Sequence, residues 1–227
     1  MSERILAVDC SNRWTSVGIM DDGALVVETN LDLGRSQAAR LPLIVQEALR
    51  KAHWSLEDLS AVAVTVGPGY FTGIRIAMAY CMALADGLSV PVIPVSSLAA
   101  LVWSDSPNGG LLVPCIRAGE GKVYCAGFRR ASGQLSLVLQ EGERSIDELR
   151  SVLSGFDGPL LLRCTEDRTL PEPGVFGDSV DIERVCCIGA LSVAATAWSH
   201  RETATSPENL RARYYRAPGL GAHGSSR

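Results

Sequence analysis

The sequence has few of the residues from which catalytic metal sites and nucleophilic triads are built. Its three histidines, at 53, 200 and 223, stand apart, and no HExxH or HxxxH pair occurs. A GxSxG elbow is absent as well, so the sequence indicates neither a metalloprotease nor a serine hydrolase. The seven cysteines form no CxxC pair and most lie in apolar runs, which predicts reduced, buried thiols and no bound metal.

The sequence also lacks a large excess of one charge and a long apolar run. A net charge of −4 and a pI near 5.4 argue against a nucleic-acid-binding surface over the whole protein. No run approaches the roughly eighteen apolar residues that span a bilayer, and the first residues show no secretion signal. With 47% hydrophobic residues the chain is expected to fold, and we expect a cytoplasmic protein without a membrane segment.

The periodicity of apolar residues predicts an α/β protein. In the first hundred residues three strands are followed by helix, strand, helix, strand and helix, and the Asp22-Gly23 pair predicts a hairpin turn between the second and third strands. A polar linker at 104–110 precedes further strands at 111–116 and 122–129 and helices at 146–153 and 188–199. The expected division is an N-terminal lobe of residues 1–104, a C-terminal lobe of 105–216 whose last helix packs back on the first lobe, and a tail of 217–227.

Asp9 and Ser11 follow the first buried strand and are candidates for a nucleotide site. A carboxylate there can hold a divalent ion or a phosphate-bound water, but the same pair can simply cap the turn. The later half offers no matching aspartate at its corresponding turn, 114–119. The sequence therefore predicts a vestigial nucleotide site.

A glycine-rich turn leads from the strand at 61–66 into the next helix. It carries Gly67, Pro68, Gly69, Thr72 and Arg75. Such turns can hold phosphate on helix N–H groups, yet this one lacks the Gly-Lys-Ser/Thr ending of a P-loop. The alternative is a stiff turn with a Thr72 helix cap and an orienting or partner-contacting Arg75.

The helix after this turn is apolar around nearly its whole circumference, so it is expected to be buried on all sides. A core helix and an interface helix fit the pattern equally well. We expect a partner to dock on the helices at 36–52 and 72–86, and Ala77→Arg to block assembly without unfolding the chain. The residues expected at that interface are Leu41, Ile44, Val45, Ala48, Gly73, Ile74, Ala77, Met78 and Cys81.

Basic and aromatic residues alternate near the C terminus. Arg211, Arg213 and Arg216 surround Tyr214 and Tyr215. This pattern can bind RNA, and it also fits a terminal segment that packs its tyrosines back on the fold.

Three segments together resemble the TsaB (YeaZ) family. They are residues 6–11 (LAVDCS) with 15–18 (TSVG), residues 66–75 (VGPGYFTGIR) and residues 91–98 (PVIPVSSL). The GPGxFTGxR segment is highly specific, whereas beyond residue 110 the match is thin. Arg35-Ser36-Gln37 stands where the family usually has a His-Ser pair, and Arg117 stands where it tends to have an acid.

The resemblance implies an actin/Hsp70-like (ASKHA), ribonuclease-H-like fold of two lobes with a degenerate nucleotide site. It implies a non-catalytic scaffold subunit in the synthesis of threonylcarbamoyladenosine in tRNA. The implied partners are a TsaD-like catalytic paralogue and a TsaE-like ATPase, which would bind the metal and ATP, with a homodimer when the chain is unpaired and tRNA reached through the complex. An M22-type peptidase or a nucleotide hydrolase using Asp9 is the alternative.

Overall fold

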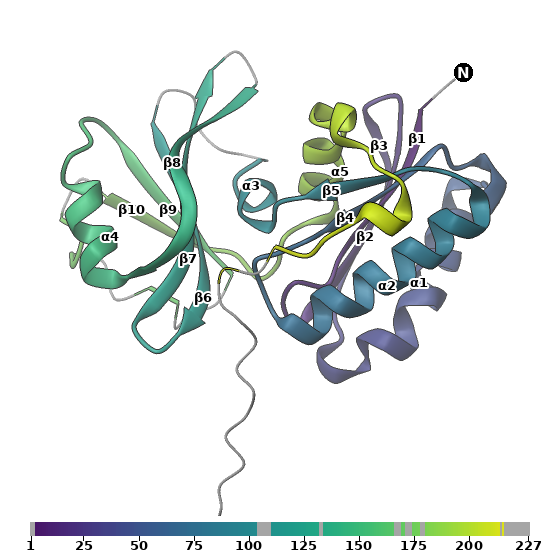
Figure 1. Cartoon of the computed structure of the whole chain (residues 1–227), viewed down its shortest axis with the longest axis horizontal. Coiled ribbons are helices and arrows are strands. Elements are labelled where there is room, and N and C mark those ends of the chain that lie inside the picture. The colour runs from purple at the N-terminus through teal and green to yellow at the C-terminus, as the bar shows by residue number, and fades with distance from the viewer. Residues whose placement is uncertain are drawn as a thin grey trace, which may run out of the picture.

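A computed structural model describes residues 3–103, 110–131, 134–165, 169–170, 174–177, 180–213 and 215 of the chain. Most of the expected linker, the expected tail at 217–227, and both Tyr214 and Arg216 lie outside the described residues. The chain forms two five-stranded sheets, each with helices packed against it (Figure 1).

The first sheet has the strand order β3-β2-β1-β4-β5. Its strands are β1 (Arg4–Asp9), β2 (Trp14–Asp21), β3 (Ala24–Asp32), β4 (Ala61–Thr65) and β5 (Val92–Val95). The first three form the predicted antiparallel meander, and β4 and β5 run parallel to β1. Consequently β1, β3, β4 and β5 all end at the same edge of the sheet, which places the turns after them side by side.

Helices cover both faces of the first sheet. On one face lie α1 (Gln37–Ala52) and α2 (Phe71–Leu88), whose apolar residues join those of β1, β2 and β4 in one core. On the other lie α3 (Ser97–Leu101) and α5 (Ala190–Ser199). Short 3₁₀ turns complete this part of the chain, at Gly34–Ser36, Leu56–Asp58, Arg201–Thr203 and Pro207–Asn209.

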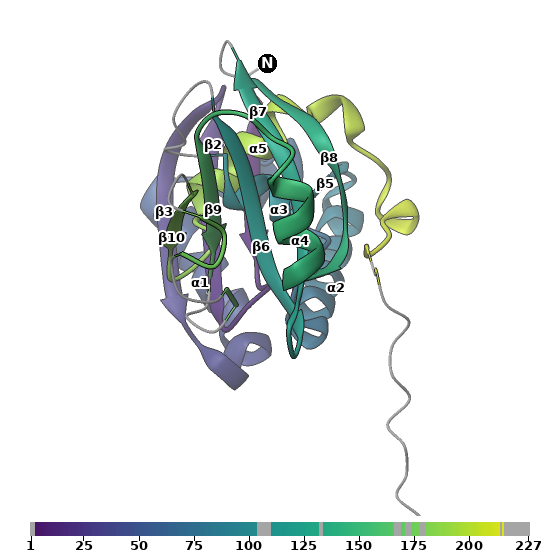
Figure 2. The same cartoon turned by 90° about the vertical axis from the view of Figure 1, so that its left-hand side faces the viewer.

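The second sheet has the order β10-β9-β6-β7-β8. Its strands are β6 (Leu111–Gly119), β7 (Lys122–Ala131), β8 (Gln134–Ser145), β9 (Leu160–Cys164) and β10 (Val180–Arg184). Helix α4 (Ile146–Leu153) covers the face turned away from the first lobe (Figure 2). A capping box fixes its start, since Ser145 and Glu148 accept each other's backbone N–H.

The inner face of the second sheet shares a core with the first lobe. Leu112 and Phe128 pack in one cluster with Ile5 of β1 and with apolar residues of α3 and α5. Helix α5 comes after the second sheet in sequence but contacts β1 and β2. The two lobes are thus joined by buried apolar contacts as well as by the chain.

The boundaries of α2 differ from those predicted. The helix begins at Phe71 with Tyr70 as the N-cap residue, so Thr72 lies inside the first turn and does not cap it. At the other end Gly87 is still helical, and Ser89, with φ of 57°, takes the left-handed capping position. The predicted Thr72 cap was wrong by two residues, because Tyr70, with extended backbone, already takes the N-cap position.

Helix α2 spans 18 residues with a mean hydropathy of 1.2, so by length and composition it could cross a membrane. No membrane-spanning segment is predicted here from the sequence pattern. A core helix of a folded domain passes the same test. Only one side of α2 is packed, against β1, β4 and α1, and 33% of the 18-residue window is buried. The prediction that this helix is buried on all sides was therefore wrong.

Candidate functional site

Asp9 lies at the end of β1 and is completely buried. Its Oδ1 accepts hydrogen bonds from Thr65 Oγ1 at 2.6 Å and from the Ser11 backbone N–H at 3.1 Å, while Oδ2 has no hydrogen-bond partner among the described residues. Burial raises the pKa of this carboxyl, against the lowering effect of those hydrogen bonds. In this structure Asp9 ties the end of β1 to β4 and to its own turn, and neither oxygen reaches solvent.

The turn after β1 is where α1 and α2 both begin. Gln37 is buried and donates from Nε2 to the carbonyl oxygens of Asn12 and Trp14, at 2.9 Å each. Gly73 packs so closely on the same turn that a Cβ there would lie 1.9 Å from the Cys10 carbonyl oxygen. Gln37 occupies part of the segment that departs from the family's usual His-Ser pair, and here it anchors α1 to the first turn.

The glycine turn is packed against the chain's own C-terminal segment. Gly67 has φ of 108°, and a Cβ there would lie 2.9 Å from the Arg213 carbonyl oxygen. The Arg213 backbone N–H donates to the Val66 carbonyl oxygen at 2.7 Å. This turn is therefore a packed junction between β4, α2 and the C-terminal segment.

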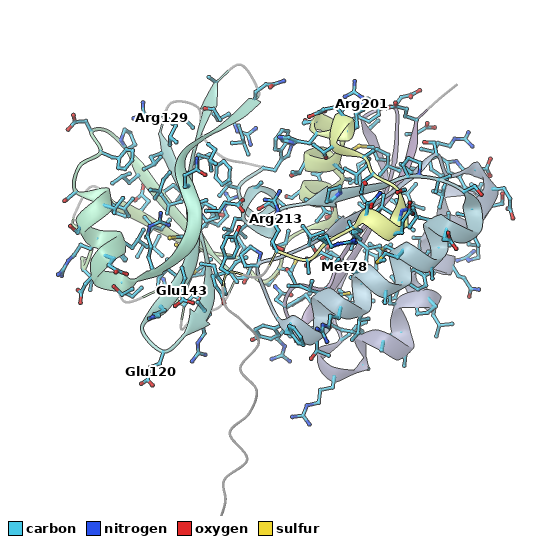
Figure 3. All side chains as sticks on the ribbon, in the orientation of Figure 1. Met78, Glu120, Arg129, Glu143, Arg201 and Arg213 are labelled. Carbon is cyan, nitrogen blue, oxygen red and sulfur yellow. The ribbon has the colours of Figure 1, made fainter. Side chains whose placement is uncertain are left out.

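The nine residues expected at a partner interface are all buried within this chain. They form the core between the first sheet and its two outer helices, and Figure 3 shows Met78 on α2. Ala77 is fully buried, so Ala77→Arg would disturb the fold itself and cannot test assembly. Buried side chains cannot meet a partner, so any contact on these helices would have to use other residues. The nine are Leu41, Ile44, Val45, Ala48, Gly73, Ile74, Ala77, Met78 and Cys81.

The outward side of the same two helices carries exposed apolar side chains. Leu43 is 56% exposed, Tyr70 47% and Phe71 39%. Arg75 is exposed and its guanidinium carbon lies 3.8 Å from the centre of the Phe71 ring, which is cation–π geometry. We call the surface formed by Leu43, Tyr70, Phe71, Arg75 and Ile76 the docking face.

A groove of about 660 Å³ lies at the start of both helices and is continuous with the docking face. Tyr70, Phe71 and Ile76 give it apolar walls, and Arg35 lines it with positive charge. Arg13 also lines the groove, but its guanidinium pairs with Asp32 at 2.9 Å. Neither α1 nor α2 has an acidic residue in its first turn, so the positive ends of both helix dipoles remain unopposed. The groove favours a partner surface that combines apolar and acidic groups.

Two of the C-terminal arginines make contacts within the chain itself. Arg211 donates to the carbonyl oxygens of Glu208 and Leu210, and Arg213 pairs with Glu141 at 3.1 Å. The ring of Tyr215 lies 5.7 Å from that of Tyr124. These contacts favour the terminal segment packing back on the fold over an RNA-binding patch; Arg216, the third arginine of the pattern, is not among the described residues.

No cluster of three or more potential metal ligands occurs in the part of the chain that the structure describes. The five cysteines at 10, 81, 115, 125 and 164 are buried, as predicted, and burial raises the pKa of Cys10 to about 12. Cys186 is exposed beside Cys187 and donates a hydrogen bond to the Cys187 sulfur at 3.7 Å; the two are not joined by a disulfide.

Two residues of this region were missed by sequence reasoning. The sequence marks Gln37 only as a departure from a family pattern, and it does not mark Glu141. Glu141 accepts hydrogen bonds from Ser96, Arg213 and Tyr215, which lie far from it in the sequence. Because all three partners are distant, no local motif could have marked it.

The family model of TsaD, tRNA N6-adenosine threonylcarbamoyltransferase, matches residues 32–175. The TsaB protein of Bacillus subtilis, named a tRNA threonylcarbamoyladenosine biosynthesis protein, is 29% identical over 157 residues, 69% of each chain. The protein of the same name from Escherichia coli is 34% identical over 129 residues, 56% of this chain and 55% of that one. The aligned segments thus span about half to two thirds of these relatives.

Solved structures show the same fold. A Pseudomonas aeruginosa protein described as similar to the peptidase YeaZ superposes with a TM-score of 0.77 at 25% identity, over 94% of this chain and all of that one. The ethanolamine utilization protein EutJ of Carboxydothermus hydrogenoformans, at a TM-score of 0.50 and 12% identity, shares the fold alone. The architecture is the actin/Hsp70-like α/β fold expected from the resemblance. By sequence and by structure, the chain belongs to the TsaB (YeaZ) family, within the group matched by the TsaD family model.

Proposed function

We propose that this protein is a non-catalytic scaffold subunit in the synthesis of threonylcarbamoyladenosine in tRNA, and that it docks a TsaD-like catalytic paralogue through its docking face. The observation that carries the proposal is the exposed apolar surface of α1 and α2. These helices cover the face of the first sheet opposite to the face that shares a core with the second lobe. Exposed aromatic and aliphatic residues that gather on one face are typical of protein interfaces. The relatives' names supply the pathway.

The buried state of Asp9 supports a scaffold role over catalysis. A carboxyl that is 0% exposed and hydrogen-bonded to Thr65 and Ser11 is poorly placed to reach a nucleotide or a substrate in this conformation. In the proposed complex the TsaD-like partner and a TsaE-like ATPase bind the metal and ATP, and tRNA is reached through the assembly. The same docking face would serve a cytoplasmic homodimer when the paralogue is absent.

The experiment is binding to the cognate TsaD-like protein, with single substitutions on the docking face. A stable interface of this kind buries about 1,600 Å². Leu43→Asp places a charge on an exposed position and Phe71→Ala removes an exposed ring, so both variants should fold. Each is expected to weaken binding about 10- to 100-fold, because central apolar residues dominate interface energies.

Val26→Asp is the matched control. Val26 is 45% exposed on β3 and alternates with Val27, which packs toward the α1 side, so Val26 faces the opposite side of the sheet. It should bind like the unmodified chain. No complex at micromolar concentration, equal weakening by all three variants, or ATP turnover by the isolated chain that is lost in Asp9→Ala would overturn the proposal.

A further inference from the structure

The segment of residues 204–213 together with Tyr215, which we call the strap, runs from the edge of the first sheet to the space between the lobes. At its start Thr205 and Val92 exchange two backbone hydrogen bonds of 2.8 Å, which extends the sheet at β5. At its end Arg213 donates its backbone N–H to Val66. Backbone hydrogen bonds thus fix the strap both to the edge strand β5 and to the glycine turn.

One carboxylate of the second lobe holds the end of the strap. Glu141 of β8 accepts from Ser96 Oγ at 2.6 Å, from Arg213 Nη1 at 3.1 Å and from the Tyr215 hydroxyl. Ser96 caps α3 in the first lobe. Glu141 therefore joins three groups that lie on two other parts of the molecule, and we call Ser96, Glu141, Arg213 and Tyr215 the latch.

The latch borders a cavity of about 680 Å³ between the lobes, and all four of its residues line that cavity. Figure 3 shows Arg213 between the lobes and Glu143, two residues beyond Glu141, on β8 of the second lobe. The Glu141 side chain is only 13% exposed, whereas that of Arg213 is 51% exposed. An ion pair that is partly shielded from water on its acidic side contributes more than a fully exposed one.

The same strap residue that the latch holds also touches the turn from which α2 begins. The Arg213 carbonyl oxygen packs on Gly67, and the Ser97 backbone N–H, next to Ser96, donates to the Gly67 carbonyl oxygen at 3.0 Å. Helix α2 starts at Phe71, four residues beyond Gly67. Arg213 and Ser96–Ser97 therefore connect Glu141 of one lobe to the start of α2 on the other.

We propose that the latch couples the spacing of the two lobes to the order of the α2 start, and so sets the affinity of the docking face. When Glu141 holds the strap, Arg213 presses on the glycine turn and Tyr70 and Phe71 are fixed. When the lobes separate, the strap loses its anchor and this end of the docking face loosens. The effect on docking rests on the proposed function; the effect on the order of the turn does not.

Glu141→Gln is the test variant and Glu143→Gln is its matched control. Both remove one carboxylate from β8, but Glu143 pairs with Lys122 of the neighbouring strand β7, at 3.0 Å, inside the second lobe. Hydrogen exchange is measured at the backbone N–H groups of Tyr70, which donates to Ser11, and Ile74, which donates to Tyr70. Partner affinity is measured on the same samples.

In Glu141→Gln the amides of Tyr70 and Ile74 should exchange about tenfold faster and partner binding should weaken about three- to tenfold, while Glu143→Gln changes neither. Unchanged exchange at Tyr70 and Ile74, or equal acceleration in both variants, overturns the coupling. Faster exchange with unchanged affinity overturns its control of docking. If the unmodified chain binds no TsaD-like partner, the proposed function fails by itself, and the exchange data still decide the coupling.

Discussion

Two glycines of α2 show how differently the same residue type is constrained at two positions. A Cβ at Gly73 would lie 1.9 Å from the Cys10 carbonyl oxygen, whereas a Cβ at Gly87 would meet nothing within 4 Å. We expect Gly73→Ala to lower the free energy of unfolding by about 2–4 kcal/mol, because backbone must move to admit the methyl group. Gly87→Ala should raise it by about 0.5–1 kcal/mol by reducing the freedom of the unfolded chain. Urea unfolding of both variants checks this, and similar effects at the two positions would contradict it.

The buried carboxyl of Asp9 gives a prediction about pH. Because burial raises its pKa above the ordinary 3.8, the folded state holds the proton more tightly than the unfolded state does. The stability this carboxyl contributes is therefore present at low pH and is lost as the pH rises from the ordinary value toward the raised one. Asp9→Asn cannot ionise, so we expect it to be the more stable form at pH 8, with a smaller advantage at pH 4. Urea unfolding at the two pH values measures this, and a stability difference that does not change with pH would contradict it.

At the scale of elements, the order of strands and helices in the first lobe was predictable from the sequence. Continuous apolar runs marked β1 and β4, and Asp22-Gly23 marked the hairpin, because these signals are local. The side of α2 that faces solvent was not predictable. Apolar residues occur all around the helix, so their spacing does not indicate which side faces the core. Only the packing against the sheet shows that Ala77 is buried and Phe71 is exposed.

Helix α1 contains an interior proline, Pro42. The helix begins at Gln37, so Pro42 lies in its second turn, exposed and without an N–H to donate. We expect Pro42→Ala to raise the free energy of unfolding by about 1–3 kcal/mol, since an interior proline costs about 3 kcal/mol relative to alanine. Thermal and urea unfolding measure this change. A loss of stability would show that the proline is adapted to its place in α1.

At the scale of the whole molecule, the two lobes share one buried cluster that includes Leu112 of β6 with α3 and α5. The core between β6 and α4, which includes Leu149, belongs to the second lobe alone. We expect such a shared core to couple the unfolding of the two lobes. The division at residue 104 expected from the linker stays a prediction.

Cooperative unfolding can be measured because the four tryptophans, 14, 54, 103 and 198, all lie outside the second sheet. Their fluorescence reports on the first lobe and its junction with the second, because the Trp103 ring centre lies 5.6 Å from the guanidinium carbon of Arg130 on β7 and Trp198 packs on the shared cluster. Far-ultraviolet circular dichroism reports on both sheets. We expect the two signals to give the same urea midpoint in the unmodified chain. Leu112→Ala should lower the free energy of unfolding by about 2–5 kcal/mol and move both midpoints together, since the cavity it leaves lies in the shared core.

Leu149→Ala is the comparison that separates coupling from a general loss of stability. It removes an equally buried leucine from the core of the second lobe. If the lobes unfold as one unit, the tryptophan midpoint must also fall in Leu149→Ala, although no tryptophan lies in that core. A tryptophan midpoint that stays fixed while the circular dichroism midpoint falls would show that the shared cluster is too weak to join the lobes. In that case the two lobes would be independently stable, and the latch at Glu141 would have to hold them in position relative to each other.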